Sequence, residues 1–125
     1  MNFNQITIPS LDLERSVNFY RTLGMQLIVE AKPRYARLLC PDGAATLSVH
    51  LVDSLPTGEG ITIYFEDDHL DELVEQLIQK GIIFIARPED KSWLWREAKL
   101  MDPDGNQIIL YHAGENRINP PWRIN

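Results

Sequence analysis

The sequence predicts an α+β fold in which one unit, a strand followed by a helix and three further strands, occurs twice in tandem. Three observations predict it: the chain length, an internal similarity between the two halves, and a Pro-Asp-Gly turn in each half. With 125 residues and 44% hydrophobic side chains, the chain has the size and composition of one globular domain. We expect a single domain over 1–125, with units at about 1–53 and 60–112 and a tail at 113–125.

The first half begins with a short apolar strand at 6–8, followed by apolar residues at helical spacing from Leu13 to Leu23. Asp12 precedes this run, and its carboxylate can cap the free backbone N–H groups of a helix. Gly24 follows the run and tolerates the left-handed conformation in which many helices end. The next apolar run then predicts a second strand.

The second half repeats this order. An apolar strand at 61–63 leads to Asp68 as the predicted helix cap, to helix-spaced apolar residues from Leu70 to Ile78, and to Gly81 at the helix end. The apolar run at 82–86 predicts the strand that follows.

A hairpin turn is predicted at the same place in each half, at Cys40-Pro41-Asp42-Gly43 and at 102–105. Proline suits the second position of a type I turn and glycine the fourth. Each turn leads into a last strand, at 45–52 and at 106–111, and the breaker-rich segment 54–59 joins the halves.

Each predicted sheet has one face covered by its helix and a second face left open. Side by side, the two open faces would form a curved mixed sheet, here called the cup, with the helices on its outer face. A concave surface of this kind suits a small-molecule ligand.

Charge and composition exclude several classes of partner. A net charge of -6 with a pI near 4.9 repels nucleic acid phosphates and anionic lipid headgroups, so we expect neither nucleic acid nor membrane partners. No apolar run approaches the length of a membrane span, and the first residues lack a secretory leader pattern, so we expect a cytoplasmic protein. The lone Cys40 is predicted to fill the core.

The run at 5–16, together with Phe19, Tyr20, Leu23 and Gly24, resembles the opening of the vicinal oxygen chelate superfamily. This superfamily contains glyoxalase I, extradiol dioxygenases, fosfomycin resistance proteins and bleomycin-binding proteins. The segment at 102–106 is similar to the hairpin near its C-terminal end. The resemblance reaches His112 and implies tandem βαβββ units, but this fold carries many chemistries.

Enzymes of this superfamily hold a divalent metal with residues from the first and last strand of each unit. The resemblance places these positions at Gln5, Ser48, Ile61 and Ile109. Only Gln5 matches, and aliphatic side chains supply no ligand atom, so we expect no metal and no other cofactor. The alternative is a relocated divalent metal site formed by Gln5, His50 and Glu97.

Strand alternation predicts which side chains line the cup. The predicted ligand-binding residues are Gln5, Tyr35, Arg37, Ser48, His50, Trp93, Trp95, Glu97, Lys99 and Tyr111, with Phe3, Thr7, Ile61, Ile63 and Ile109 on the same faces. Arg37, Lys99 and Glu97 on a concave face imply pairing, water or a polar ligand, and two cations against one carboxylate favour an anion. A register shifted by one residue would instead place Arg96 in the cup.

Several of these residues leave alternatives open. His50 suits a ligand-binding residue, a general base or a core histidine, while Trp93 and Trp95 either stack on a planar ligand or fill the interior. In the tail, two prolines precede Trp122, which predicts that the tail docks on the domain or on a second subunit. Arg117 or Arg123 would then reach the mouth of the pocket.

Together these observations predict a homodimeric small-molecule-binding protein of this superfamily without the usual metal. Whether the protein is an enzyme stays open. The enzymatic alternative is a lyase, isomerase or thiol transferase with His50 or Glu97 as base and Arg37, Lys99 or Arg96 as electrostatic stabiliser. A third interpretation is a filled pocket and a role in assembly.

Overall fold

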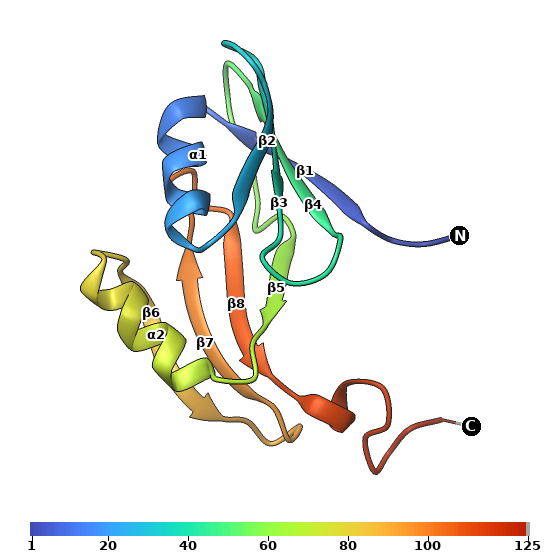
Figure 1. Cartoon of the computed structure of the whole chain (residues 1–125). Helices are drawn as coiled ribbons and strands as arrows, with labels where there is room; N and C mark the ends of the chain where they lie inside the picture. Colours follow the sequence, from blue (N-terminus) through green and yellow to red (C-terminus); the bar gives the residue numbers. More distant parts are fainter. Residues whose placement is uncertain (125) are drawn as a thin grey trace. The chain divides into compact units, whose positions relative to one another are not determined.

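The computed structural model describes residues 1–124 and contains two compact units (Figure 1). Unit 1 comprises Met1–Gly60 and Asp102–Asn106, and unit 2 comprises Ile61–Met101 and the chain from Gln107 onward. Each unit has one four-stranded sheet and one α-helix, so the α+β class and the tandem βαβββ order are confirmed. Asn125, the last residue of the predicted tail, lies outside the described residues.

Unit 1 is built from five elements: β1 (Gln5–Ser10), α1 (Leu13–Thr22), β2 (Gln26–Ala31), β3 (Tyr35–Leu39) and β4 (Thr46–Leu51). The strand order is β1-β4-β3-β2, with β1 parallel to β4 and the other neighbours antiparallel. Figure 1 shows α1 against one face of this sheet, in agreement with its contacts to β2, β3 and β4.

The start and end of α1 follow from local chemistry. The Asp12 carboxylate accepts a hydrogen bond from the Arg15 backbone N–H at 3.1 Å, which satisfies one of the free donors of the first turn. Gly24, at φ +108°, takes the left-handed exit that a side chain would strain. Between them Leu13, Val17 and Tyr20 bury their side chains in the core of unit 1.

Unit 2 repeats this architecture with β5 (Thr62–Glu66), α2 (Leu70–Gln79), β6 (Phe84–Asp90), β7 (Arg96–Met101) and β8 (Gln107–His112). The strand order is β5-β8-β7-β6, and a short 3-10 helix, η1 (Gly114–Arg117), follows β8. Across residues 1–124, no helix has the length and apolar character needed to cross a membrane.

The predicted register of the first strand of unit 2 is wrong by one residue. His69, not Asp68, occupies the N-cap of α2, and its side chain makes no capping bond; the Asp67 carboxylate instead accepts from the His69 N–H at 2.7 Å. Thr62 pairs with Gln107 on β8 as Gln5 pairs with Thr46 on β4. Thr62 therefore takes the place that the sequence assigned to Ile61.

This shift reverses the faces of β5, because successive side chains point to opposite sides of a strand. Ile63, predicted to line the cup, is 9% exposed and belongs to the core of unit 2. Ile61 precedes the strand and is 53% exposed. The open side of β5 carries Tyr64 instead.

Both predicted Pro-Asp-Gly turns form. The Cys40 N–H donates to the Ala45 carbonyl, and the Asp102 N–H donates to the Asn106 carbonyl, each at 3.0 Å. Gly43 and Gly105 have φ values of +76° and +85°, the left-handed conformation expected of a glycine that closes such a turn.

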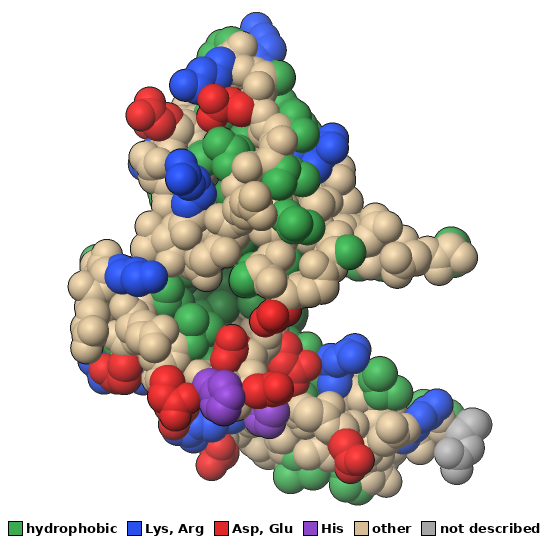
Figure 2. Space-filling model, viewed as in Figure 1, with side chains coloured by type: hydrophobic (Ala, Val, Ile, Leu, Met, Phe, Trp, Pro, Cys, Tyr) green, Lys and Arg blue, Asp and Glu red, His purple; other side chains and the backbone are tan. Residues whose placement is uncertain are grey.

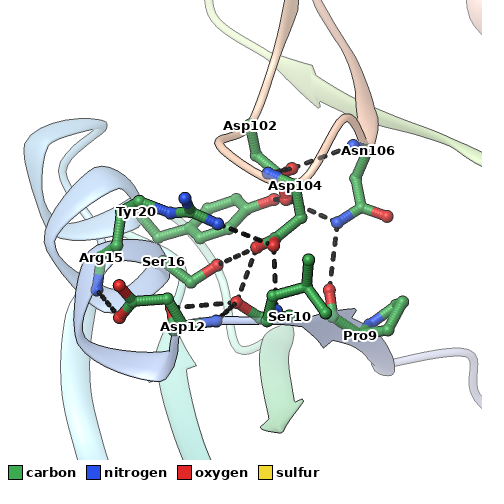
Figure 3. A network of polar contacts seen from close by, with 10 residues as sticks. Pro9, Ser10, Asp12, Arg15, Ser16, Tyr20, Asp102, Asp104 and Asn106 are labelled. Atoms are coloured by element: carbon green, nitrogen blue, oxygen red, sulfur yellow. Dashed lines mark hydrogen bonds and ion pairs between the residues drawn. The ribbon is translucent and has the colours of Figure 1, made fainter. Parts of the chain in front are cut away.

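The turn at 102–106 packs within unit 1 through buried carboxylates (Figure 3). The Asp104 side chain is fully buried and accepts four hydrogen bonds, from Ser10 Oγ at 2.6 Å, the Leu11 N–H at 2.9 Å, Arg15 Nη2 at 2.9 Å and Ser16 Oγ at 3.2 Å. Asp102 accepts from the Tyr20 hydroxyl at 2.6 Å. These carboxylates supply the acceptors for polar groups at the start of α1, so unit 1 is complete only with this turn.

Candidate ligand-binding site

Each sheet has one face that its helix leaves uncovered. The strand pairings place on the open face of unit 1 the side chains of Gln5, Thr7, Pro9, Tyr35, Arg37, Leu39, Thr46, Ser48 and His50. The open face of unit 2 carries Thr62, Tyr64, Glu66, Glu97, Lys99, Gln107, Ile109 and Tyr111. These two surfaces contain most of the residues that the sequence proposed as ligand-binding, and their role in binding stays a prediction.

On unit 1, Gln5, Tyr35, Arg37, Ser48 and His50 share the open face. Tyr35 pairs with His50, and Arg37 pairs with Ser48, across β3 and β4. Gln5 pairs with Thr46, four residues before His50 on β4, which corresponds to about 13 Å along the strand. Gln5 and His50 therefore lie toward opposite ends of this face.

The centre of the open face of unit 1 is a hydrogen-bonded group of three side chains, Tyr35, Arg37 and Ser48. The Tyr35 hydroxyl lies 2.6 Å from Ser48 Oγ and accepts from Arg37 Nε at 3.0 Å. The guanidinium carbon of Arg37 also lies 5.5 Å from the centre of the Tyr35 ring. Hydrogen bonding to Ser48, and then to the Arg37 cation, lowers the pKa of Tyr35 below its ordinary value.

On unit 2, the open face is aromatic. Trp95, just before β7, stacks on Tyr111 with ring centres 4.7 Å apart and planes 19° apart, and Tyr64 meets both rings edge-on. Trp93 donates its indole N–H to Glu97 at 2.6 Å, and Glu97 is only 8% exposed. Burial, followed by the Glu66 carboxylate, raises the pKa of Tyr111.

Arg96 lies on the helix-covered side of its sheet, so the shifted register that would have placed it on the open face does not occur. Its guanidinium pairs with Asp71 of α2 at 2.9 Å and with Asp90 of β6 at 3.0 Å. These bonds raise the pKa of Arg96 and lower that of Asp71. Glu97 and Lys99 consequently point to the open face.

The beginning of the tail is anchored on unit 2 through Glu66. The carboxylate of Glu66 accepts from the backbone N–H groups of Ala113 and Gly114 at 2.7 and 3.0 Å, and Arg117 lies 3.7 Å from it. Further along, Trp122 is 57% exposed. The start of the tail therefore contacts unit 2, and docking of Trp122 itself, on the domain or on a second subunit, stays a prediction.

A second polar cluster lies near the start of α2, where Figure 2 shows histidines among acidic side chains. His112 Nδ1 is 3.7 Å from Asp68, and His69 Nδ1 is 3.4 Å from Glu72. These groups border a hollow of about 250 Å³. The pairs are exposed to solvent and stabilise the unit only weakly.

A larger hollow, of about 540 Å³, lies on unit 1 away from the open face, with Leu13, Val17, Leu27 and Leu51 among its lining residues. No pattern in the sequence predicts either hollow. Both depend on where helix starts and turns come to lie, which residue spacing alone does not determine.

The metal positions implied by the superfamily become Gln5, Ser48, Thr62 and Ile109 once β5 is placed correctly. Ile109 has no ligand atom, Ser48 Oγ is bonded to Tyr35, and Gln5 Oε1 accepts from Thr46 at 2.9 Å. Within residues 1–124, no cluster of three or more His, Cys, Asp or Glu is placed to hold a metal ion. This donor set does not fit a divalent cation, which requires three or four N, O or S ligands.

The protein thus consists of two tandem βαβββ units. Each unit has an open sheet face with polar and aromatic side chains, so the duplicated unit presents two candidate binding surfaces. Residues 2–110 match the Glyoxalase/Bleomycin resistance protein/Dioxygenase superfamily, and the chain belongs to this superfamily. The resemblance seen in the sequence is thus confirmed.

Among curated proteins, the chain is similar to a probable trivalent organoarsenical cleaving enzyme of Bacillus subtilis (strain 168), with 25% identity over 129 residues, covering 93% of this chain and 83% of the relative. Among solved structures, it is similar to a glyoxalase/bleomycin resistance protein/dioxygenase from Nocardioides, with a TM-score of 0.81, 23% identity, and coverage of 100% and 90% of the two chains. A bleomycin-binding protein in complex with bleomycin has a TM-score of 0.72, 23% identity and coverage of 90% and 98%. The structural similarities establish the fold.

Proposed function

We propose that this protein binds a small, partly aromatic organic molecule on the open faces of its sheets, without the divalent metal used by enzymes of the superfamily. The observation that carries the proposal is the aromatic cluster of unit 2. Trp95 and Tyr111 stack on each other, while Tyr64 is 51% exposed and Trp93 is 44% exposed. Exposed aromatic side chains beside a few ordered polar groups are typical of small-molecule sites.

The polar groups near this cluster support the same proposal. Glu97 is nearly buried and is held by the Trp93 indole, and Lys99 occupies the neighbouring position on the same face of β7. The Tyr64 and Trp95 rings are perpendicular, so a planar ligand that stacks on one of them would meet the other edge-on, and Glu97 and Lys99 would offer it an acceptor and a cation. The structural neighbour that binds bleomycin supports a ligand of this general kind.

Binding is tested by titrating the full chain with bleomycin and, separately, with the neutral planar molecule caffeine, while following tryptophan fluorescence. We expect saturable quenching with at least one probe. Tyr64→Leu and Trp95→Ala should weaken binding about tenfold, since base-aromatic stacking of comparable area contributes on the order of 1 to 3 kcal/mol. Trp122→Ala, which removes an exposed tail tryptophan, is the matched control and should change the dissociation constant less than about twofold.

A second arm of the experiment addresses the metal. Treatment of the protein with EDTA should leave the dissociation constant unchanged, because the residues at the expected metal positions do not form a ligand set. Loss of binding after EDTA, restored by a divalent cation, would overturn the metal-free proposal. Absence of saturable quenching with either probe would overturn the binding proposal itself.

A second candidate function is cleavage of a trivalent organoarsenical, the probable activity of the Bacillus relative, whose match covers 93% of this chain. In this chain Cys40 is the only thiol, and burial raises its pKa, which reduces the thiolate available to a soft element such as arsenic. His50 on unit 1 and Glu97 on unit 2 are the candidate bases. Release of arsenite from methylarsonous acid by the full chain, lost in Cys40→Ser, would establish this activity over simple binding.

We also propose that the protein is a cytoplasmic homodimer. Exposed apolar side chains support an interface between copies, among them Ile83 at 86% and Ile85 at 56% exposure, along with Trp122. The acidic net charge and single cysteine are compatible with a reducing compartment. Light scattering during size-exclusion chromatography should give twice the chain mass of 14.4 kDa, and a monomer mass at micromolar concentration would contradict the dimer.

A further inference from the structure

The hydroxyl of Tyr35 is held by two neighbours on the open face of unit 1. Arg37 Nε–H can only donate, so it occupies one lone pair of the Tyr35 oxygen at 3.0 Å. The Ser48 hydroxyl, 2.6 Å away, can either donate to this oxygen or accept from it. When Ser48 donates, the Tyr35 oxygen accepts two hydrogen bonds and its own proton is free to point away from both.

Burial makes this arrangement rigid. Ser48 is 0% exposed, and Tyr35 is its hydrogen-bond partner among the side chains described. Tyr35 and Arg37 are half-buried on the neighbouring strand, and their spacing of two residues directs both side chains to the open face. The open end of this group therefore presents one phenolic O–H donor and the terminal N–H groups of one guanidinium.

The charge of Arg37 points to the chemistry of the ligand. Within residues 1–124, Arg37 has no carboxylate close enough to form an ion pair, in contrast to Arg15, Arg87, Arg96 and Arg117. A half-buried cation without a counterion favours an anionic partner. The group offers one positive charge and two neighbouring donors, the tyrosine O–H and the guanidinium N–H groups. A carboxylate, with one negative charge shared by two oxygens, matches these donors better than a dianion such as phosphate does.

We propose that Tyr35, Arg37 and Ser48 bind the carboxylate group of a small organic acid on the open face of unit 1. Tyr35 donates its hydroxyl proton in a hydrogen bond to one carboxylate oxygen, and Arg37 donates from its terminal nitrogens to the carboxylate. Ser48 is a positioning residue, because it donates to the Tyr35 oxygen and fixes the direction of the tyrosine O–H. This inference rests on the proposed small-molecule function and names the ligand class for this face.

The lowered pKa of Tyr35 agrees with this arrangement, since donors directed at its oxygen stabilise the phenolate and make the hydroxyl a stronger hydrogen-bond donor. The matched position of unit 2 provides an internal comparison. Lys99 faces Ile109 there, as Arg37 faces Ser48, and Glu97 stands where unit 1 has Tyr35. Unit 2 thus has a cation at the same place without the tyrosine and serine that complete the group.

The experiment is an NMR titration of the full chain with benzoate and, in parallel, with benzamide, which has the same shape and no charge. Labelling tyrosine at the ring carbon that carries the hydroxyl reports directly on Tyr35. We expect benzoate to shift the Tyr35 signal in a saturable manner and benzamide to leave it unchanged. Tyr35→Phe and Arg37→Gln should each weaken benzoate binding about tenfold, as loss of one charge-assisted hydrogen bond predicts.

Controls separate a binding role from a structural one. Arg21→Gln, which removes an exposed cation in the last turn of α1, should change benzoate affinity less than about twofold. Ser48→Ala should weaken benzoate binding several-fold and move the pKa of Tyr35 upward, because it removes the hydrogen bond to the Tyr35 oxygen. Loss of the packing of Ser48 alone would not move this pKa. Ser48→Thr, which retains the hydroxyl, should restore both, and thermal melting identifies any variant that fails to fold.

Three outcomes would overturn the proposal: equal binding of benzoate and benzamide, equal weakening by Arg21→Gln and Arg37→Gln, or full competition by inorganic phosphate at the same concentration. Absence of benzoate binding would overturn it as well. If benzoate fails while bleomycin or caffeine still binds, the ligand class is wrong and the proposed function stands. If none of them binds, both fail.

Discussion

The two units share a backbone plan and differ in the chemistry of their open faces. Strand pairing matches Ser48 with Ile109, His50 with Tyr111, Arg37 with Lys99, and Tyr35 with Glu97. Unit 1 therefore presents hydrogen-bond donors around a cation, whereas unit 2 presents stacked aromatic rings beside a carboxylate. Among these four matched pairs, only Arg37 and Lys99 share a charge.

The helix-covered faces of the same strands agree closely. Ala36 and Leu38 of unit 1 match Ala98 and Leu100 of unit 2, and all four are at most 1% exposed. Close packing under a helix restricts the size of these side chains, so the two units carry the same residues there. The open faces are free of that restriction. The difference between the units therefore lies on the open faces, where we propose that the ligand binds.

The largest effect that tests this comparison concerns the two Pro-Asp-Gly turns. Asp104→Ala removes the acceptor of four donors in unit 1 and should lower the free energy of unfolding by about 3 to 5 kcal/mol, measured by urea denaturation. Asp42 holds the same position in the first turn and is exposed, so Asp42→Ala should change the free energy of unfolding by less than about 0.5 kcal/mol. Equal losses in the two variants would show that the turns are equivalent after all.

A smaller effect tests the register of β5. Ile63→Ala should lower the free energy of unfolding by about 2 to 4 kcal/mol, since it leaves a cavity in the core of unit 2. Ile61→Ala, before the strand, should cost less than about 1 kcal/mol. The reverse order in the same denaturation assay would restore the register expected from the sequence.

The pH dependence provides the next test, because unit 1 contains a buried tyrosine with an acidic partner. Burial, then the charge of Asp102, raises the pKa of Tyr20 above its ordinary value of 10.0. Above pH 10 the unfolded chain loses the Tyr20 proton while the folded chain retains it, so this stabilisation is complete below pH 10 and decreases as the pH rises. The expected slope is about 1.4 kcal/mol per pH unit.

Tyr20→Phe isolates this contribution. The free energy of unfolding of this variant should decrease less steeply above pH 10 than that of the wild type. The variant also leaves Asp102 without one donor, so it should be less stable at neutral pH. The pKa of Tyr35 is lowered, so its contribution to the free energy of unfolding increases with pH, opposite to that of Tyr20. The free energies of unfolding of the wild type and of Tyr20→Phe must therefore be compared at each pH. An identical alkaline slope in the wild type and in Tyr20→Phe would contradict the assignment.

The smallest effect compares the two helix starts. Asp12→Ala should cost about 1 kcal/mol, because the carboxylate caps the Arg15 N–H of α1. His69→Ala at the corresponding position of α2 removes no side-chain cap and should cost a few tenths of a kcal/mol. Thermal denaturation of the two variants beside the wild type measures the difference.

These comparisons also explain which features the sequence could predict. Asp12, Gly24, Gly81 and the two turns act through contacts only a few residues apart, so residue type and spacing were sufficient to locate them. The start of α2 was ambiguous, because Asp67, Asp68 and His69 all suit the beginning of a helix. With Asp68 as the helix cap, the predicted faces of β5 are one residue away from those in the structure, so Ile61 and Ile63 are predicted on the wrong side.

The features that the sequence missed depend on contacts between distant residues. Asp104 lies 94 residues after Ser10, and no local pattern connects the two. The same is true of Glu66, which anchors the backbone at Ala113 from 47 residues away. On the open face of unit 1, strand alternation predicts that Tyr35, Arg37 and Ser48 share one surface. The hydrogen bonds of the tyrosine hydroxyl to the other two side chains follow only from the three-dimensional structure.

The turn at 102–106 has a consequence for how the protein responds to cleavage. Because this turn belongs to unit 1, the chain passes from one unit to the other at 60–61, at 101–102 and at 106–107. A protease that cuts the exposed linker at 54–59 therefore leaves fragments that remain associated, since the second fragment carries part of the fold of the first. The first 53 residues expressed alone would lack the Asp104 carboxylate that accepts from Ser10 and Arg15, so this segment does not contain all of unit 1.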